Sequence, residues 1–194
     1  TSDGTLIPAG NIVLGGIGSN RTVTLTPAAN LNGGPVTITL TVSDGSLTAQ
    51  TSFDVTVLAV NDAPTIGSAA FTVPENAVNG TLVGTVVASD VDLGDTQSFS
   101  ITGGDPLNAF AIDALGRITV ADSSQLDFET HPSWSLTVQV RDSAGATNSA
   151  LVTIDLLDRN DNPPVILSQG GGTSAALSVA ENSTAVTTVI ANDA

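Results

Sequence analysis

One stretch decides the fold of this chain: Asp158-Arg159-Asn160-Asp161-Asn162-Pro163-Pro164. Short acidic motifs lie upstream, each where a strand pattern gives way to turn residues: Pro74-Glu75-Asn76, Asp90-Val91-Asp92, Leu126-Asp127-Phe128-Glu129 and Arg141-Asp142-Ser143. Carboxylates gathered at one end of a β-sandwich repel each other unless a hard cation that prefers oxygen ligands lies between them. The motifs therefore indicate Ca²⁺ held between tandem β modules rather than an enzyme.

Alternation of apolar and polar residues is the dominant pattern along the chain. It occurs in residues 36–42, 53–57, 118–120, 134–140 and 152–156. Gly, Asn, Asp and Pro separate these segments, and no amphipathic helical period is present. Several short strands with this spacing predict an all-β sandwich.

The composition restricts the partners and the chemistry. The net charge of −15 comes from 19 acidic residues against four arginines and no lysine. Such a chain is repelled by phosphate backbones and anionic lipid headgroups, so nucleic acid is a poor partner. The chain has no cysteine, which excludes disulfides, thiolate metal sites and cysteine nucleophiles. No targeting segment or apolar run of membrane length is present.

Internal repeats predict the domain organisation. Asn61-Asp62-Ala63-Pro64 recurs 99 positions later as Asn160-Asp161-Asn162-Pro163. The unit is therefore about 100 residues long. We expect a complete module at residues 63–162, the later strands of a preceding module at 1–62, and the first strands of a following one at 163–194. The two partial modules should pack less fully, because half a sandwich cannot cover its apolar face.

The motifs of residues 63–162 together resemble a cadherin repeat, and the flanking segments resemble parts of neighbouring cadherin-like repeats. The resemblance rests on Pro74-Glu75-Asn76, Asp90-Val91-Asp92, Leu126-Asp127-Phe128-Glu129, Arg141-Asp142-Ser143-Ala144-Gly145 and Asp158-Arg159-Asn160-Asp161-Asn162-Pro163, in this order. It implies a seven-stranded Greek-key β-sandwich with Ca²⁺ at each junction between modules.

The resemblance also implies the ligands of the later junction: Glu75, Asp127, Glu129, Asp158, Asn160, Asp161, Asn162 and Asp193. Six of these residues are carboxylates, and Arg159 is the only basic residue in the linker. Two like charges about 4 Å apart cost roughly 4 kcal/mol at an effective dielectric constant near 20. Two or three Ca²⁺ ions would offset most of that repulsion, whereas Mg²⁺ keeps its waters and demands a strict octahedron.

The earlier junction would use Asn61, Asp62, Asp90, Asp92 and Asp142. Its lower half departs from the family pattern. Alanines at 59 and 63 replace the Asp and Asn of the later linker, and residues 28–31 hold no acid. We therefore expect fewer ions, or weaker binding, near Asp62 than near Asp161.

Two aromatic residues and one acidic pair could suggest other chemistry. His131 lies between Thr130 and Pro132 in a predicted surface turn without a nucleophile motif, which argues against a catalytic triad. Trp134 begins an alternating strand and is expected in the core. Asp127 and Glu129 could form a glycosidase pair on composition alone, but the repeat context disfavours that interpretation.

Two functions remain open at this point. The first is a Ca²⁺-binding cadherin-like module of a large bacterial surface or secreted adhesin. It would mediate or space cell adhesion, with neighbouring modules, homophilic contacts or cell-surface ligands as partners and no catalytic activity. The second is an accessory, carbohydrate- or surface-binding β-sandwich of a secreted hydrolase. Both place the protein outside the cell or on its surface.

Overall fold

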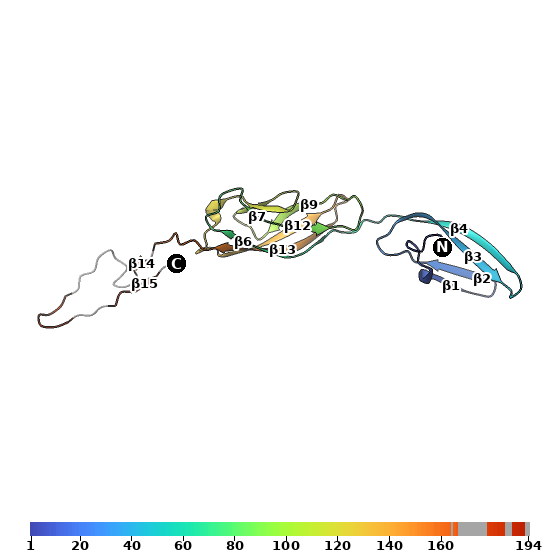
Figure 1. The fold of residues 1–194 in the computed structure, drawn as a ribbon, viewed down its shortest axis with the longest axis horizontal. Coiled ribbons are helices and arrows are strands. Elements are labelled where there is room, and N and C mark those ends of the chain that lie inside the picture. The colour runs from blue at the N-terminus through green and yellow to red at the C-terminus, as the bar shows by residue number, and fades with distance from the viewer. Residues whose placement is uncertain (164, 167–177, 185–187, 193–194) are drawn as a thin grey trace. The chain divides into compact units, whose positions relative to one another are not determined.

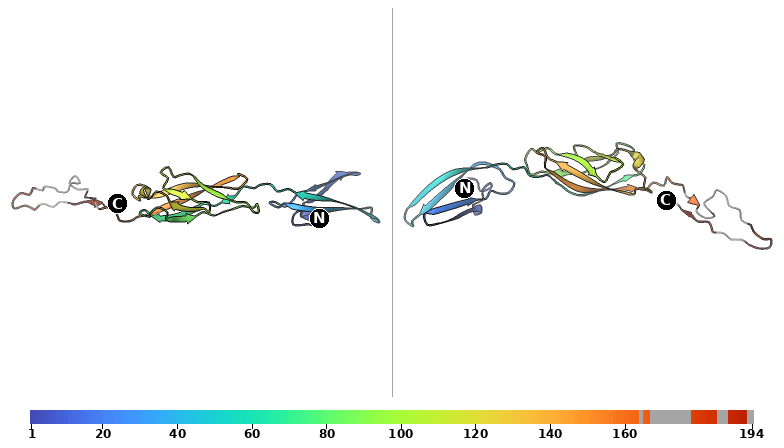
Figure 2. Two further views of the ribbon diagram at one scale, coloured as in Figure 1. Left: turned by 90° about the horizontal axis from the view of Figure 1, so that it is seen from above. Right: turned by 180° about the vertical axis from the view of Figure 1, so that it is seen from behind.

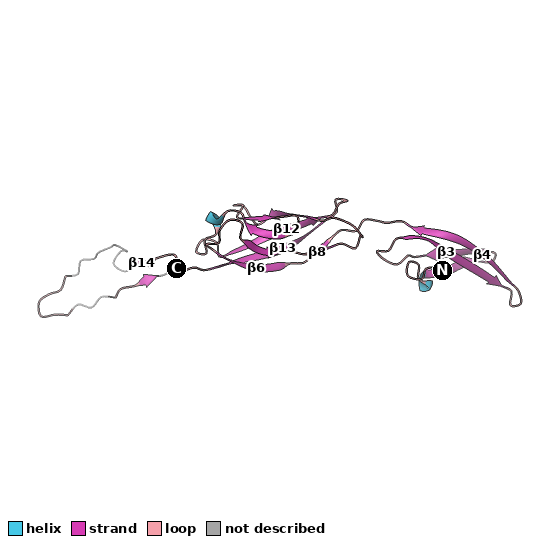
Figure 3. Ribbon diagram, turned by 45° about the horizontal axis from the view of Figure 1, so that its top comes forward, coloured by secondary structure: helices cyan, strands magenta, loops and turns pink. Residues whose placement is uncertain are grey.

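The computed structural model describes residues 1–163, 165–166, 178–184 and 188–192 (Figure 1). Strands dominate these residues (Figure 3). The two helices among them are three-residue 3-10 turns, η1 (Ala9–Asn11) and η2 (Ser123–Gln125). The prediction of an all-β fold is confirmed. Neither of these turns has the length or the apolar character that a membrane-spanning helix requires.

The chain divides into two compact units. The first unit comprises Thr1–Thr65, Ala88–Gln97 and Arg141–Asn148. The second unit comprises Ile66–Val87, Ser98–Val140 and Ser149–Ala194. The division into modules at 1–62, 63–162 and 163–194 stays a prediction.

The first unit contains two antiparallel hairpins. β1 (Ile12–Ile17) pairs with β2 (Asn20–Leu25), and β3 (Gly33–Ser43) pairs with β4 (Thr48–Val57). Gly18 has a φ of 62° in the turn between β1 and β2, a left-handed conformation that glycine adopts without strain. The buried core of this unit consists of Leu6, Ile7, Val36 and Ile38.

The second unit is a sandwich of two sheets. The four-stranded sheet has the order β6 (Ala69–Pro74), β13 (Thr147–Leu157), β12 (Ser133–Arg141) and β9 (Ser98–Gly103). The three-stranded sheet has the order β10 (Phe110–Ile112), β11 (Arg117–Val120) and β7 (Leu82–Thr85). β6 runs parallel to β13, whereas β11 is antiparallel to both of its neighbours. The strands of this unit lie along one common axis, some of them antiparallel to others (Figure 2).

A short strand pair occurs twice along the chain. β5 (Thr65–Ile66) pairs with β8 (Ala88–Ser89), and β14 (Val165–Ile166) pairs with β15 (Ala191–Asn192). The recurrence agrees with the repeat found in the sequence, because both pairs lie at corresponding positions of it.

The core of the second unit follows the predicted alternation. In β12 the side chains of Trp134, Leu136 and Val138 are buried, while the residues between them are exposed or half-buried. In β13, Val152, Ile154 and Leu156 are buried in the same way. Side chains from both sheets thus close one apolar interior, as period-two strands require.

The two units differ in how fully they are packed. Thirteen buried apolar residues form the core of the second unit, against four in the first, counted over the described residues. On β1, Leu14 and Ile17 are 71% and 90% exposed. This difference agrees with the expectation for residues 1–62. Most of residues 163–194 lie outside the described part of the chain.

Candidate metal centre

Three carboxylates of the first unit converge, and we call Asp90, Asp95 and Asp142 the first acidic cluster. One oxygen of each lies within 4.8 Å of the others. Asp90 directly follows β8, Asp95 lies in the loop after it, and Asp142 begins the turn that follows β12. Asp142 is far from the other two in sequence, so the meeting of strand ends brings it to them.

Asp142 is the most firmly held member of this cluster. Its side chain is only 5% exposed. It accepts hydrogen bonds from Asn61 Nδ2 at 2.8 Å, Gly145 N at 2.5 Å and Ala146 N at 2.7 Å. These donors, the Asn61 amide above all, hold the pKa of Asp142 below its usual value. Asp142 is therefore ionised and held in a fixed orientation at neutral pH, which suits a candidate ligand.

The linker residues connect to the same cluster through a chain of hydrogen bonds. The backbone N–H of Asp62 donates to Asp92 Oδ2 at 2.7 Å, and the N–H of Asp92 donates to Asp90 Oδ1 at 3.0 Å. The predicted residues Asn61, Asp62, Asp90, Asp92 and Asp142 therefore lie in one connected network.

Asp90 is the member of the first acidic cluster with an unsatisfied oxygen. Its Oδ2 is buried and has no hydrogen-bond partner among the described residues. A buried carboxylate oxygen without a partner is costly. A bound cation would satisfy this oxygen and would also offset the repulsion from the Asp95 and Asp142 carboxylates.

Asp95 belongs to the cluster, although the sequence prediction omitted it. The hydroxyl of Ser143 donates to Asp95 Oδ1, which connects this loop to the turn of Asp142. Its position five residues after Asp90 was the available signal. Acids so close in one loop can turn toward one ion, even where they complete no known ligand motif.

The second unit holds a second acidic cluster, consisting of Glu75, Asp127 and Glu129. One oxygen of each also lies within 4.8 Å of the others. Glu75 follows β6, and the other two lie in the loop between η2 and β12. All three were predicted as ligands of the later junction.

Glu75 is buried and already hydrogen-bonded. Its side chain is 3% exposed. Oε2 accepts from Phe128 N at 2.8 Å, and Oε1 accepts from Arg159 N at 2.6 Å. One carboxylate therefore fastens both the acidic loop and the start of the linker, and a metal would share its oxygens with these amides.

Asp127 and Glu129 are exposed. Asp127 accepts from the Thr130 hydroxyl at 2.7 Å and from the Thr130 N–H at 3.1 Å. These bonds, the hydroxyl bond first, lower the pKa of Asp127. Asp127 is thus ionised at neutral pH. Its exposed position leaves room for a cation.

The remaining predicted ligands of the later junction are placed differently. Asp161 and Asn162 line one hollow together with Glu75, Asp127 and Glu129. Asp158 and Asn160 are exposed, and neither belongs to the two carboxylate clusters found among the described residues. Asp193 lies outside the described residues.

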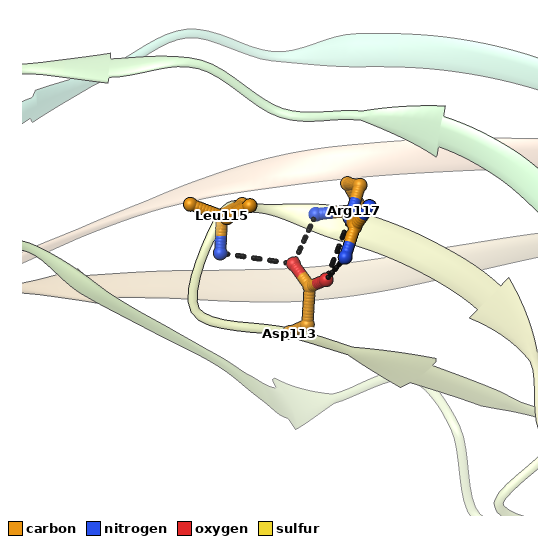
Figure 4. Close-up of polar contacts among 3 residues, drawn as sticks. All are labelled: Asp113, Leu115 and Arg117. Carbon is orange, nitrogen blue, oxygen red and sulfur yellow. Dashed lines mark hydrogen bonds and ion pairs between the residues drawn. The ribbon is translucent and has the colours of Figure 1, made fainter.

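Asp113 shows that not every ordered acid is a candidate ligand. Its Oδ1 accepts from Leu115 N and Arg117 N, and its Oδ2 accepts from Arg117 Nε at 2.7 Å (Figure 4). The Arg117 N–H contributes most to lowering the pKa of Asp113. This acid closes the turn between β10 and β11 and is neutralised by its own arginine.

The aromatic residues are used for packing. Trp134 is 4% exposed. Its ring meets Phe110 edge-on at 5.5 Å and stacks on His131 at 5.4 Å. The prediction of a core tryptophan is confirmed, and His131 is exposed in a loop, as expected.

The residues of both clusters fit Ca²⁺. All the donors are oxygens, as a hard cation of this size requires. In the first cluster a buried carboxylate oxygen lacks a partner. In the second, carboxylates and an amide line one open hollow.

The middle of the chain matches a known domain family. A family model described as a cadherin domain matches residues 69–157. These residues fall within the predicted module at 63–162 and include Glu75, Asp127 and Glu129 of the second cluster.

Curated animal proteins are similar over a larger part of the chain. Human "Protocadherin alpha-3" is 36% identical over 166 residues, which cover 78% of this chain and 17% of that protein. The "Fat-like cadherin-related tumor suppressor homolog" of Drosophila melanogaster is 38% identical over 132 residues, which cover 63% of this chain and 3% of that protein. The chain thus spans a small fraction of the length of these relatives.

Solved structures of the same kind share the fold. "Protocadherin gammaB7 EC3-6 cis-dimer structure" has a TM-score of 0.58 at 28% identity and covers 81% of this chain and 42% of that chain. "Protocadherin Gamma B2 extracellular cadherin domains 3-6" has a TM-score of 0.57 at 28% identity and covers 82% of this chain and 42% of that chain. The β-sandwich prediction therefore agrees with these neighbours.

Proposed function

Residues 69–157 belong to the cadherin domain family, and from this premise we propose that the chain is a calcium-binding, extracellular adhesion module. Ca²⁺ bound at the linkers would stiffen a tandem array of such modules. Without the ion, the carboxylates repel each other and the linkers swivel. The single observation that supports this most strongly is the buried, unpartnered Asp90 Oδ2 within the first acidic cluster.

The proposed Ca²⁺ ligands form two sets, one near each linker. Near the first linker the oxygens come from Asp90, Asp95 and Asp142, with Asn61, Asp62 and Asp92 around them. Near the second linker they come from Glu75, Asp127, Glu129, Asp161 and Asn162. Asp158, Asn160 and Asp193 stay predicted ligands of the second site.

The proposed role is mechanical and adhesive rather than catalytic. Neighbouring modules of the same chain are the first partners, and homophilic contacts or cell-surface ligands are the second. The similar protocadherin gammaB7 forms a cis-dimer in its solved structure, which favours homophilic contacts here. The proposed location is the extracellular space or the cell surface.

We also propose a bacterial source for the protein. The lysine-free and cysteine-free composition supports a large bacterial surface adhesin. The relatives named above come from animals, so the bacterial assignment rests on composition alone. Sequencing the gene and its flanking regions tests it, and a eukaryotic genomic context would reject it.

The alternative of a carbohydrate-binding module is less well supported. Sugar binding uses exposed aromatic platforms, and the single tryptophan is 4% exposed between Phe110 and His131. Glycan binding that persists in chelator would favour this alternative.

Calorimetric titration with Ca²⁺, combined with thermal unfolding, tests the main proposal. Ligand at 100 times Kd stabilises a folded protein by about 2.7 kcal/mol. For domains of this size, that free energy corresponds to a Tm rise of roughly 10 °C. Mg²⁺ at the same concentration should raise Tm much less, because it keeps its waters. The proposal fails if millimolar Ca²⁺ produces neither heat nor a Tm shift.

Small-angle scattering tests the mechanical part separately. With Ca²⁺ the maximum dimension should be larger and better defined than with chelator, because a stiffened linker samples fewer bent arrangements. An unchanged scattering profile in a protein that binds Ca²⁺ would retain the metal site and reject the stiffening role.

A further inference from the structure

Four strands lie at the sheet edges of the second unit, and β9 differs from the other three. β10 and β7 have only three and four residues, and β6 ends with Pro74. Short edge strands and proline are two ways in which proteins prevent pairing at an edge. β9 has six residues, Ser98–Gly103, without a proline or a charged side chain. It is therefore an edge without these protections.

The backbone of β9 is hydrogen-bonded on one side. β12 is its neighbour in the four-stranded sheet. Outside that pairing, no backbone hydrogen bond of Phe99 to Gly103 occurs among the described residues. β9 lies well inside the residues matched by the cadherin domain model, 69–157, so both sheets of the unit are present around it. The side away from β12 presents N–H and C=O groups that can pair with another strand.

A hollow of about 560 Å³ adjoins this edge and is lined by β9, β10 and the loop between them. Its apolar wall includes Phe99, Ile101, Phe110 and Ile112. Asp105 is the one charged residue in its lining. The two oxygens of Asp105 accept the N–H groups of Ala109 at 2.8 Å and Phe110 at 2.9 Å. The hollow therefore suits uncharged, apolar side chains.

The sequence of β9 is complementary to itself. Ser98, Ser100 and Thr102 are exposed, whereas Phe99 and Ile101 are half-buried. Residues directly opposite each other in an antiparallel pair lie on the same face of the sheet. With Ser100 opposite Ser100, Phe99 lies opposite Ile101 and Ser98 lies opposite Thr102. Polar residues then face polar ones, and apolar residues face apolar ones.

We propose that β9 pairs antiparallel with β9 of a second copy of this chain, with Ser100 opposite Ser100. The four-stranded sheets of the two copies then continue into one another. Phe99 and Ile101 of the second copy project toward the hollow of the first. Aromatic and β-branched residues that face each other across two strands stabilise the pair.

The charge pattern favours a second copy over a basic peptide as the occupant. A basic peptide would need acids along the edge, but residues 96–104 carry no charge. The acids that flank this segment are engaged elsewhere, Asp95 with the Ser143 hydroxyl and Asp105 with two backbone N–H groups. An uncharged strand with apolar residues at alternate positions suits this edge, and β9 is itself such a strand.

This inference rests on the homophilic part of the proposed function and gives it a surface. The pairing is isologous and closes on a two-fold axis. It also reverses the direction of one unit against the other, as for two chains that extend from facing surfaces. A contact through one short strand is small, below about 1,200 Å², so one pair binds weakly. Several units in an array would add their contacts.

The absence of cysteine permits a clean cross-linking test on the full chain. Ser100→Cys introduces one thiol, so a disulfide can form only between copies. Opposite residues of an antiparallel pair have Cα atoms about 4.5–5.5 Å apart, within the range that a disulfide spans. Thr102→Cys is the matched control, because Thr102 is exposed on the same face of β9. In the proposed register the two copies of Thr102 are roughly 13 Å apart, too far for a disulfide.

In a glutathione buffer, the disulfide of Ser100→Cys should form roughly tenfold faster than that of Thr102→Cys, because pairing raises the local thiol concentration. Equal rates, or a faster reaction of Thr102→Cys, would overturn the proposal. The ionic strength is held at about 0.15 M, where the screening length of about 8 Å weakens the repulsion between chains of net charge −15.

Sedimentation velocity of the full chain gives a second readout. The unmodified chain should show association that grows with concentration. Ser100→Asp should abolish it, because the pairing would place two like charges opposite each other. Ser135→Asp is the control and should retain association, since Ser135 is exposed on the neighbouring strand β12. Loss of association in both variants, or in neither, would overturn the proposal.

These outcomes are separable from failure of the proposed function. Ca²⁺ titration of Ser100→Asp should give the same heat as that of the unmodified chain, since Ser100 lies in neither acidic cluster. Association that persists in Ser100→Asp would reject the β9 contact and leave a homophilic function through another surface. A chain that binds Ca²⁺ but does not associate at any concentration would reject the homophilic contact and leave the calcium-binding module.

Discussion

The two acidic clusters hold their carboxylates in different ways. In the first cluster, Asp142 is buried and held by an amide and backbone N–H groups, and an oxygen of Asp90 is buried without a partner. In the second, Glu75 is buried but both its oxygens accept backbone N–H groups, while Asp127 and Glu129 are exposed. The first cluster has a buried oxygen without a hydrogen-bond partner, whereas the buried acid of the second cluster holds two backbone segments together.

This contrast bears on the relative affinities of the two sites. The sequence predicts weaker binding near Asp62, because the lower half of that junction lacks acids. The preorganised oxygens around Asp142 favour stronger binding there, since fewer side chains need to be ordered by the ion. The sequence-based ranking of the two Ca²⁺ affinities stays a prediction. Substitutions in each cluster test which site binds more tightly.

The largest expected effect belongs to Asp142→Asn. It removes a charged ligand from the first cluster and should weaken Ca²⁺ binding at that site roughly 100-fold. Calorimetric titration measures this change. Asp113→Asn is the matched control, because Asp113 is also a hydrogen-bonded aspartate but lies outside both clusters. Equal effects of the two substitutions would show that charge removal alone weakens binding.

Glu75→Gln should destabilise the second unit even without metal. The amide can accept only through one oxygen, so the N–H of Phe128 or of Arg159 would face an NH₂ group. Leaving a buried donor unsatisfied costs about 1–3 kcal/mol. Urea unfolding in chelator measures this loss, with the exposed Asp127→Asn as comparison. If both variants unfold at the same urea concentration, Glu75 does not have the fastening role.

Asn61→Ala removes the linker amide that orients the Asp142 carboxylate. The pKa of Asp142 should rise toward its usual value, because the Asn61 bond is the first cause of its lowering. Ca²⁺ affinity at the first cluster should fall about tenfold. Carbon-detected NMR titration follows the pKa, and calorimetry follows the affinity. Asn162→Ala is the control, since Asn162 belongs to the hollow of the second cluster.

The smallest effect concerns pH. Asp142 and Asp127 have folded-state pKa values below the ordinary 3.8. A lowered carboxyl pKa contributes stability that is fully present above the unfolded-state value and is lost as pH falls through the folded-state value. In chelator, Tm should therefore be insensitive to these two groups above about pH 5 and should fall below about pH 4.

Asp142→Asn should reduce that acid-induced loss of stability. Thermal unfolding measured between pH 2 and pH 7 checks both statements. A Tm that is independent of pH over the acidic range, or one that rises as pH falls, would contradict them.

The sequence predicted which acids lie near one another, because these acids stand at turn positions fixed by the repeat, and their role as metal ligands stays a prediction. Glu75, Asp127 and Glu129 meet as the motifs indicated, and so do Asp90 and Asp142. Asp95 was missed because its loop conformation, rather than its spacing to another motif, turns it toward Asp142. Asp158 stands in the linker but in neither cluster of the described residues, because proximity in sequence does not fix where an exposed side chain lies.

The sequence by itself determined the strands, their alternation and the repeat, because these depend on local backbone preferences and on a period of two. It also determined that acids gather at the turns. Only the tertiary structure decided which oxygens are buried, which are already hydrogen-bonded and which are left without a partner. Those properties depend on the meeting of loops such as those of Asn61 and Asp142, 81 residues apart. Residue spacing along the chain cannot give the geometry of that contact.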